Sequence, residues 1–111
     1  MEIEEALQVI IATMYHCENM QPKFKEGSAQ YTLLKNRIAA LRVVISLMRQ
    51  EENGTLKELK QAQAPIASIL QKCTKALSKQ EPGSNTHQRL ERMIASMKIA
   101  QTLIEERIDQ K

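Results

Sequence analysis

Two short segments of the sequence carry residue types that are well suited to binding an anion. They read KFKEGSAQY at 23–31 and KQEPGSNTH at 79–87, and each places a Gly-Ser step at the start of an expected helix. The free amides of a helix N-terminus, the close approach that glycine permits and flanking basic side chains form a natural anion site. The sequence therefore predicts two anion-binding corners, one in each half of the chain.

The candidate ligand-binding residues of these corners are polar, basic or aromatic. In the first corner they are Lys23, Ser28, Gln30, Tyr31 and Lys35. In the second corner they are Ser84, Thr86, His87, Arg89 and Arg92. The rings of Tyr31 and His87 would allow a nucleobase to stack, and Arg37 and Lys79 add further positive charge. A simpler interpretation is also open, in which each serine only caps its helix and the basic side chains are solvated.

The sequence contains no recognisable catalytic or metal-binding motif. A nucleophile needs a base within hydrogen-bond reach, and the two histidines, His16 and His87, lie in no such motif. Cys17 and Cys73 have neither CxxC nor zinc-ligand spacing, and adjacent residues such as His16 and Cys17 point about 100° apart on a helix. We therefore expect a non-enzymatic protein without a metal or cofactor, in which both cysteines pack as small apolar side chains. A disulfide between them or a metal site is the alternative.

Both corners belong to an internal repeat that spans most of the chain. Without any gap, residues 6–48 align with residues 62–104, and ten positions are identical. The identical pairs are Ala6/Ala62, Ile10/Ile66, Cys17/Cys73, Lys23/Lys79, Gly27/Gly83, Ser28/Ser84, Leu34/Leu90, Ile38/Ile94, Ala39/Ala95 and Leu47/Leu103. Most of the apolar pairs recur at helical spacing, which indicates a duplicated helical hairpin.

Apolar periodicity, together with capping and helix-breaking residues, divides the chain into four expected helices. Apolar residues at steps of three and four predict helices at about 2–20, 28–50 and 55–77, and from about 84 to the chain end. Asn53-Gly54 is expected to end the second helix, and a capping-box pattern at 55–58 is expected to start the third. Pro65 predicts a kink or a break beside Ala64.

These elements predict an all-α fold, an up-down-up-down four-helix bundle formed by tandem duplication of a helical hairpin. We expect a single domain over 1–111, with one hairpin at about 2–50 and the other at about 55–110. A chain with 42% apolar but only 3% aromatic residues builds its core from aliphatic side chains, which suits helices. The second half of the second helix is apolar on more than one side, which indicates a central position or a subunit interface, and we expect a homo-oligomer.

The charge distribution limits the classes of partner. Residues 23–49 include six basic residues and one acidic residue, and residues 57–98 include eight basic and three acidic residues. These basic stretches are either solvated helix faces or a surface that attracts an anion or an acidic protein. Acids interrupt the bases and no recognition-helix motif is present, so nucleic-acid binding is not expected. No apolar run approaches 18 residues and the acidic start lacks the basic region of a signal peptide, so we expect a cytoplasmic protein that does not bind membranes.

The stretch GSAQYTLLKNRIAAL at 27–41 resembles short helical proteins of Firmicutes and their phages. More distantly, its loop, serine, glutamine and leucine-rich helix are similar to the helical-hairpin domain of phage anti-CBASS and anti-Thoeris sponges, which sequester cyclic nucleotide signals. This resemblance implies ligand contacts near Ser28, Gln30, Tyr31 and Lys35. The chain departs from that pattern because it is duplicated, and the second copy replaces Lys35 by Glu91.

The sequence supports two functional hypotheses of different classes. In the first, the protein is a phage or bacterial sponge with an anti-defence role, and it sequesters an anionic, cyclic nucleotide signal at its corners. In the second, it is a protein-interaction module of immunity, antitoxin-like or inhibitor type, and it presents an apolar and basic face to an acidic protein. The two hypotheses differ in whether the partner is a small molecule or a protein.

Overall fold

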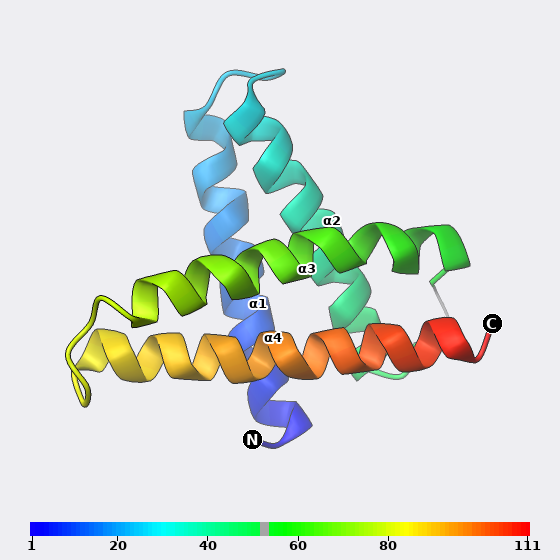
Figure 1. Cartoon of the computed structure of the whole chain (residues 1–111). Coiled ribbons are helices and arrows are strands. Elements are labelled where there is room, and N and C mark those ends of the chain that lie inside the picture. Colours follow the sequence, from blue (N-terminus) through cyan, green and yellow to red (C-terminus); the bar gives the residue numbers. More distant parts are fainter. Residues whose placement is uncertain (52–53) are drawn as a thin grey trace.

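Four α-helices make up most of the chain in the computed structural model, which describes residues 1–51 and 54–111. In chain order they are α1 (Ile3–Met20), α2 (Ala29–Met48), α3 (Leu56–Leu77) and α4 (Asn85–Asp109), with a short 3₁₀ helix, η1 (Gln21–Lys23), after α1 (Figure 1). The described residues contain no strand, and no helix among them is both long and apolar enough to cross a membrane. The predicted all-α, four-helix bundle is confirmed.

Side-chain caps fix the start of three of the four helices. Ser28 Oγ accepts a hydrogen bond from the Tyr31 amide at 3.2 Å, and Ser84 Oγ accepts one from the His87 amide at 3.1 Å. Thr55 caps α3 in the same way. Each bond satisfies an amide that the first helical turn leaves without a partner inside the helix, so the helices begin close to the predicted positions.

The end of α2 lies at Met48, slightly before the predicted one. Gln50 adopts a φ of +59°, and the Glu51 amide donates to the Ser46 carbonyl at 2.9 Å. These two features are those of a Schellman motif, which closes the last turn of a helix. The sequence predicted that Asn53-Gly54 ends this helix, and Asn53 lies outside the described residues.

α3 runs without interruption through Pro65, so a break at this position is excluded. A proline removes only one backbone donor from the helix. Ala62 and Ile66, which flank Pro65, are almost completely buried. Their packing holds both parts of α3 against the core and compensates for the missing hydrogen bond.

The two hairpins cross each other in two layers. α1 packs beside α2, α3 packs beside α4, and the second hairpin lies across the first (Figure 1). The molecule measures 42 by 37 by 19 Å, and since a helix with its side chains is about 10 Å wide, the shortest dimension corresponds to two helices. α2 contacts both helices of the second hairpin, whereas α1 contacts only α4.

Equivalent residues of the two hairpins form the core. Four of the identical repeat pairs are at least nine-tenths buried: Ala6/Ala62, Ile10/Ile66, Cys17/Cys73 and Leu34/Leu90. Ala40 and its repeat equivalent Ser96 are also buried, and small side chains at such positions allow helices to approach closely. The duplication therefore maintains one apolar core that both hairpins share.

The central position of α2 accounts for its second apolar side. Nine of its residues are buried within the chain: Leu34, Arg37, Ile38, Ala40, Leu41, Val44, Ile45, Leu47 and Met48. These side chains are covered by the other helices without a second subunit. The apolar residues of α2 are therefore explained without a subunit interface. Association into a homo-oligomer stays a prediction.

Truncating Ile10 or Ile66 to alanine should destabilise the protein by similar amounts. Both side chains are fully buried at equivalent positions, and truncation of a buried isoleucine typically costs about 2 to 5 kcal/mol. Urea denaturation followed by circular dichroism measures the loss. Ile3→Ala is the matched control because this side chain is 51% exposed, and an equal loss in all three variants would contradict a shared core.

Candidate functional site

The two predicted corners lie at the tips of different hairpins. The first is the turn between α1 and α2, and the second is the turn between α3 and α4 (Figure 1). Each contains a glycine of positive φ, +89° at Gly27 and +86° at Gly83, a conformation that glycine adopts more readily than other residues. Ser28 and Ser84 follow as helix caps. The repeated Gly-Ser step therefore has a structural explanation in both hairpins.

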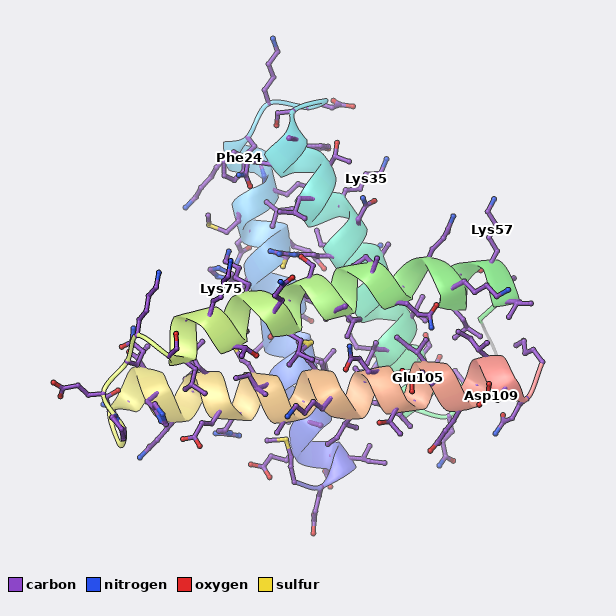
Figure 2. All side chains as sticks on the ribbon, viewed as in Figure 1. Phe24, Lys35, Lys57, Lys75, Glu105 and Asp109 are labelled. Carbon is purple, nitrogen blue, oxygen red and sulfur yellow. The ribbon has the colours of Figure 1, made fainter. Side chains whose placement is uncertain are left out.

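The first corner presents its polar side chains mostly to solvent. Lys23, Gln30 and Lys35 are exposed, and Tyr31 is half-buried. Figure 2 shows Lys35 projecting from α2 on the side away from α1. An anion held by Lys35 would therefore lie on the outer side of the first hairpin.

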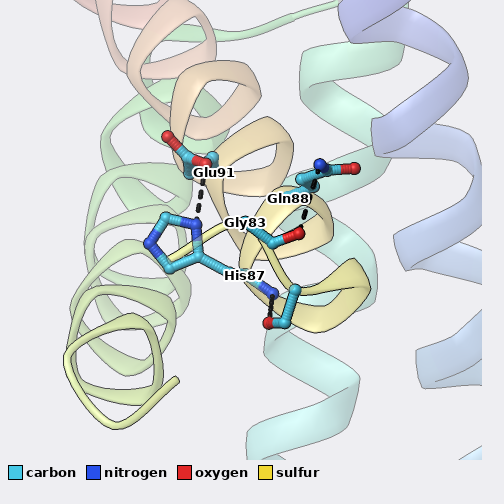
Figure 3. Close-up of polar contacts among 5 residues, drawn as sticks. Gly83, His87, Gln88 and Glu91 are labelled. Carbon is cyan, nitrogen blue, oxygen red and sulfur yellow. Dashed lines mark hydrogen bonds and ion pairs between the residues drawn. The ribbon is translucent and has the colours of Figure 1, made fainter. Parts of the chain in front are cut away.

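In the second corner, two of the five predicted ligand residues, Ser84 and His87, have polar partners within the chain (Figure 3). His87 Nδ1 lies 2.8 Å from Glu91 Oε1, one helical turn further along α4. The Ser84 hydroxyl oxygen is occupied by the His87 amide, and Thr86 is exposed. Since Glu91 replaces Lys35 of the first repeat, this corner carries a carboxylate where the first corner carries an ammonium group.

A groove of about 800 Å³ lies between the two hairpins. It is lined by α1 between Gln8 and Cys17, by α3 between Ile69 and Ala76, and by the start of α4 between Asn85 and Met93. α2 contributes only Arg37. Of the ten predicted site residues, Arg89 and Arg92 line this groove and the other eight do not.

The groove is basic. Its cationic side chains are Arg37, Lys72, Arg89 and Arg92, and no carboxylate of the described residues lines it. Arg92 is paired with Glu5 at 3.3 Å. The first turns of α4, which form one wall, add the positive end of a helix dipole. Glu105 and Asp109 lie toward the opposite end of this helix (Figure 2), so the charge of α4 is unevenly distributed along its length.

Arg37 differs from the other cations of the groove because it is only 8% exposed. Its Nη2 donates a hydrogen bond to Ser68 Oγ of α3 at 3.1 Å, which links the two hairpins. Its Nε is buried and has no hydrogen-bond partner in the described part of the chain. A buried guanidinium with a neutral hydroxyl as partner is unusual, since buried charges are normally paired.

Repeat-equivalent residues meet in this groove. The pairs that line it are Thr13/Ile69, His16/Lys72, Cys17/Cys73 and Arg37/Met93. Lys72 was not among the residues predicted from the sequence, and Arg37 was predicted only as an additional positive charge. The repeat was the available signal for Lys72. Residues 13, 16 and 17 have the i, i+3 and i+4 spacing of one side of a helix, and their repeat equivalents are residues 69, 72 and 73.

Two buried thiols lie beside these cations. Burial raises the pKa of Cys17 above its ordinary value of 9.0, and the positive charges of Arg37 and Lys72 offset this only in part. Burial also raises the pKa of Cys73, with Lys72 as the largest opposing charge. Among the described residues, no group of three histidine, cysteine or acidic side chains is placed to hold a metal. The expected packing of both cysteines inside the fold is confirmed.

The two thiols are too far apart to form a disulfide within one chain. No Cα atom of α1 lies within 8 Å of a Cα atom of α3, so this limit also separates Cys17 from Cys73. A disulfide needs a separation below about 7 Å. Both cysteines are therefore free in this fold.

Removing either serine cap should weaken the fold without affecting the groove. Ser28→Ala and Ser84→Ala should each lower the free energy of unfolding by about 1 kcal/mol, because an amide of the first helical turn loses its partner. Urea denaturation measures this loss. Thr86→Ala is a control within the second corner, since Thr86 is exposed and is not the cap of α4. A negligible effect at both serines would contradict the capping role.

The raised pKa values of the thiols should make part of the stability depend on pH. Above pH 9 the unfolded chain loses its thiol protons while the folded chain retains them, so the thiol contribution is full below this pH and falls as the pH rises through the folded pKa. We expect the free energy of unfolding to fall more steeply above pH 9 in the native chain than in a Cys17→Ala/Cys73→Ala variant. Parallel slopes in urea denaturation would contradict the raised pKa values.

Comparisons with known proteins do not assign this chain to a family. No protein-family model, curated protein or solved structure matches it. Its function has to be inferred from the groove and from the residues that line it.

Proposed function

We propose that the protein is a non-enzymatic binding protein that sequesters a small anionic nucleotide, with cyclic nucleotides as the first candidates. The groove between the hairpins carries this proposal, because four cationic side chains line one concave surface that no described carboxylate shares. Positive charge concentrated in a cleft raises the local concentration of anions. The proposal therefore moves the ligand from the two predicted corners to the groove.

The remaining lining of the groove suits the other parts of a nucleotide. Its volume of about 800 Å³ is in the range of small-molecule sites, which is roughly 300 to 1,000 Å³. Aliphatic side chains such as Ile69 and Leu90 offer an apolar wall, and the amides of Gln8, Asn85 and Gln88 offer donors and acceptors for base or sugar groups. Charge, apolar surface and amides thus occur together.

The chemical character of the lining supports binding without catalysis. The thiols of Cys17 and Cys73 have raised pKa values, so at neutral pH they are protonated and are weak nucleophiles. The side chains of Arg37, Lys72, Arg89 and Arg92 hold an anion in place but do not accept a proton from it, and among the described lining residues only His16 carries an imidazole.

The proposal includes a cytoplasmic location and an anti-defence role. Two free, buried thiols fit a reducing compartment, where disulfides are rare. The anti-defence role is supported by the resemblance of residues 27–41 to the sponge hairpins. The ligand contacts which that resemblance implies at the first corner are replaced in this proposal by contacts in the groove.

Thermal denaturation with a panel of cyclic and linear nucleotides tests the proposal. A ligand present at about 100 times its dissociation constant adds about 2.7 kcal/mol to the free energy of unfolding. We expect at least one member of the panel to raise the melting temperature by several degrees. Isothermal titration calorimetry then measures its affinity and stoichiometry.

Charge reversals distinguish the groove from the corners. Lys72→Glu and Arg89→Glu should abolish the shift because each puts a carboxylate into the groove, whereas Lys35→Glu at the first corner should leave it unchanged. All three side chains are exposed, so the variants should fold. If only Lys35→Glu abolishes the shift in melting temperature, the ligand binds at the first corner and not in the groove. Absence of any shift, with capture of an acidic protein instead, would favour the interaction module.

A further inference from the structure

We infer that Arg37 anchors a phosphate group of the ligand, and that the bound phosphate joins the two hairpins. This inference deepens the proposed function and rests on it for the groove as the ligand site. Arg37 was predicted from the sequence only as additional positive charge at the first corner, whereas the structure places it in the groove. Four of its properties support the role: its burial, its incomplete hydrogen bonding, its replacement by methionine in the other hairpin and its cationic neighbours.

The hydrogen bonding of Arg37 is incomplete at a nitrogen atom that lies away from the protein surface. The side chain is 8% exposed, yet it lines the groove. Ser68 accepts from Nη2 at 3.1 Å, while the buried Nε has no partner in the described residues. Buried polar groups are normally satisfied, and an exception calls for an explanation such as an ion that the protein binds. An oxyanion accepts from several N–H groups of one guanidinium.

The second hairpin indicates that packing does not require a cation at this position. The repeat equivalent of Arg37 is Met93, which is half-buried and lines the same groove. An apolar side chain of similar length therefore satisfies the equivalent place in the other hairpin. Replacement of a buried charge by an apolar residue is often neutral or stabilising, so the presence of Arg37 needs a reason other than the core.

Three cations from three helices line the groove within electrostatic range of one thiol. Lys72 of α3, Arg37 of α2 and Arg89 of α4 all act on the Cys73 thiol by their charge. None of the three forms an ion pair within the described residues. A phosphate carries up to two negative charges and several acceptor oxygens, so it can neutralise such a cluster. This is the chemical reason for assigning a phosphate to the site.

A phosphate at this point would connect the two hairpins. Arg37 belongs to the first hairpin, whereas Lys72 and Arg89 belong to the second. Contacts with all three would add charge-assisted hydrogen bonds across the crossing, beside the existing bond from Arg37 to Ser68. Since the unfolded chain cannot form this arrangement, binding should stabilise the folded protein.

Thermal denaturation with inorganic phosphate and the Arg37→Met variant tests the inference. At constant ionic strength, phosphate should raise the melting temperature of the native chain. In Arg37→Met, which copies the residue of the other hairpin, the phosphate affinity should fall by at least about tenfold, equivalent to about 1.4 kcal/mol. Without phosphate, the melting temperature of this variant should be equal to that of the native chain or higher.

Two further variants control for charge and for folding. Lys35→Gln removes one positive charge from the exposed outer side of α2 and should respond to phosphate like the native chain. Arg37→Lys keeps the charge but loses the planar set of donors, so its phosphate affinity should also fall. An equal phosphate response in Arg37→Met and the native chain would overturn the inference, as would a lower melting temperature of Arg37→Met without phosphate.

The outcome for Arg37 can be separated from the outcome for the nucleotide proposal. If a nucleotide binds the native chain and Arg37→Met equally well, the inference fails and the proposed function stands. If no nucleotide binds, but inorganic phosphate stabilises the native chain in a manner that depends on Arg37, the phosphate site stands and the nucleotide proposal fails. If neither probe has an effect, both are refuted.

Discussion

Two crossed hairpins hold this fold together by burying each other's apolar faces. α1 buries only Ala6, Ile10 and Cys17 almost completely, which is too little apolar surface to hold a helix in water without its neighbours. α2 supplies the largest part of the core and contacts every other helix. α3 crosses α1 (Figure 1), and no Cα atom of α1 lies within 8 Å of a Cα atom of α3. The groove lies along these two helices, so it is a consequence of the packing.

Local signals in the sequence predict the helices well but not the way in which the hairpins meet. Ser28, Thr55 and Ser84 act through hydrogen bonds to amides three residues away, so their effect can be read from adjacent residues. The apolar seams predict which face of each helix is buried. The crossing depends on contacts between helices that are distant in the sequence, such as α1 and α4, and periodicity carries no information about that geometry.

The same distinction applies to the candidate site. The corners stand out in the sequence because Gly27-Ser28 and Gly83-Ser84 are contiguous, yet their conspicuous pattern is explained by backbone geometry and capping. The groove takes residues from all four helices, so no short motif describes it. Arg37 is the clearest example, because its position in a basic stripe suggests a solvated side chain, whereas in the folded chain it is buried and bonded to Ser68 of α3.

Conservation and divergence between the two repeats fall on different parts of the fold. The fully buried pairs Ala6/Ala62 and Ile10/Ile66 are identical, whereas three of the four pairs that line the groove differ. The two repeats also differ in charge. The equivalents of the cationic residues Lys72, Arg89 and Arg92 are His16, Leu33 and Asn36. Three of the four groove cations therefore come from the second hairpin and only Arg37 from the first. A two-fold symmetric ligand would meet unequal partners, so this distribution of charge favours a ligand with its anionic group at one end.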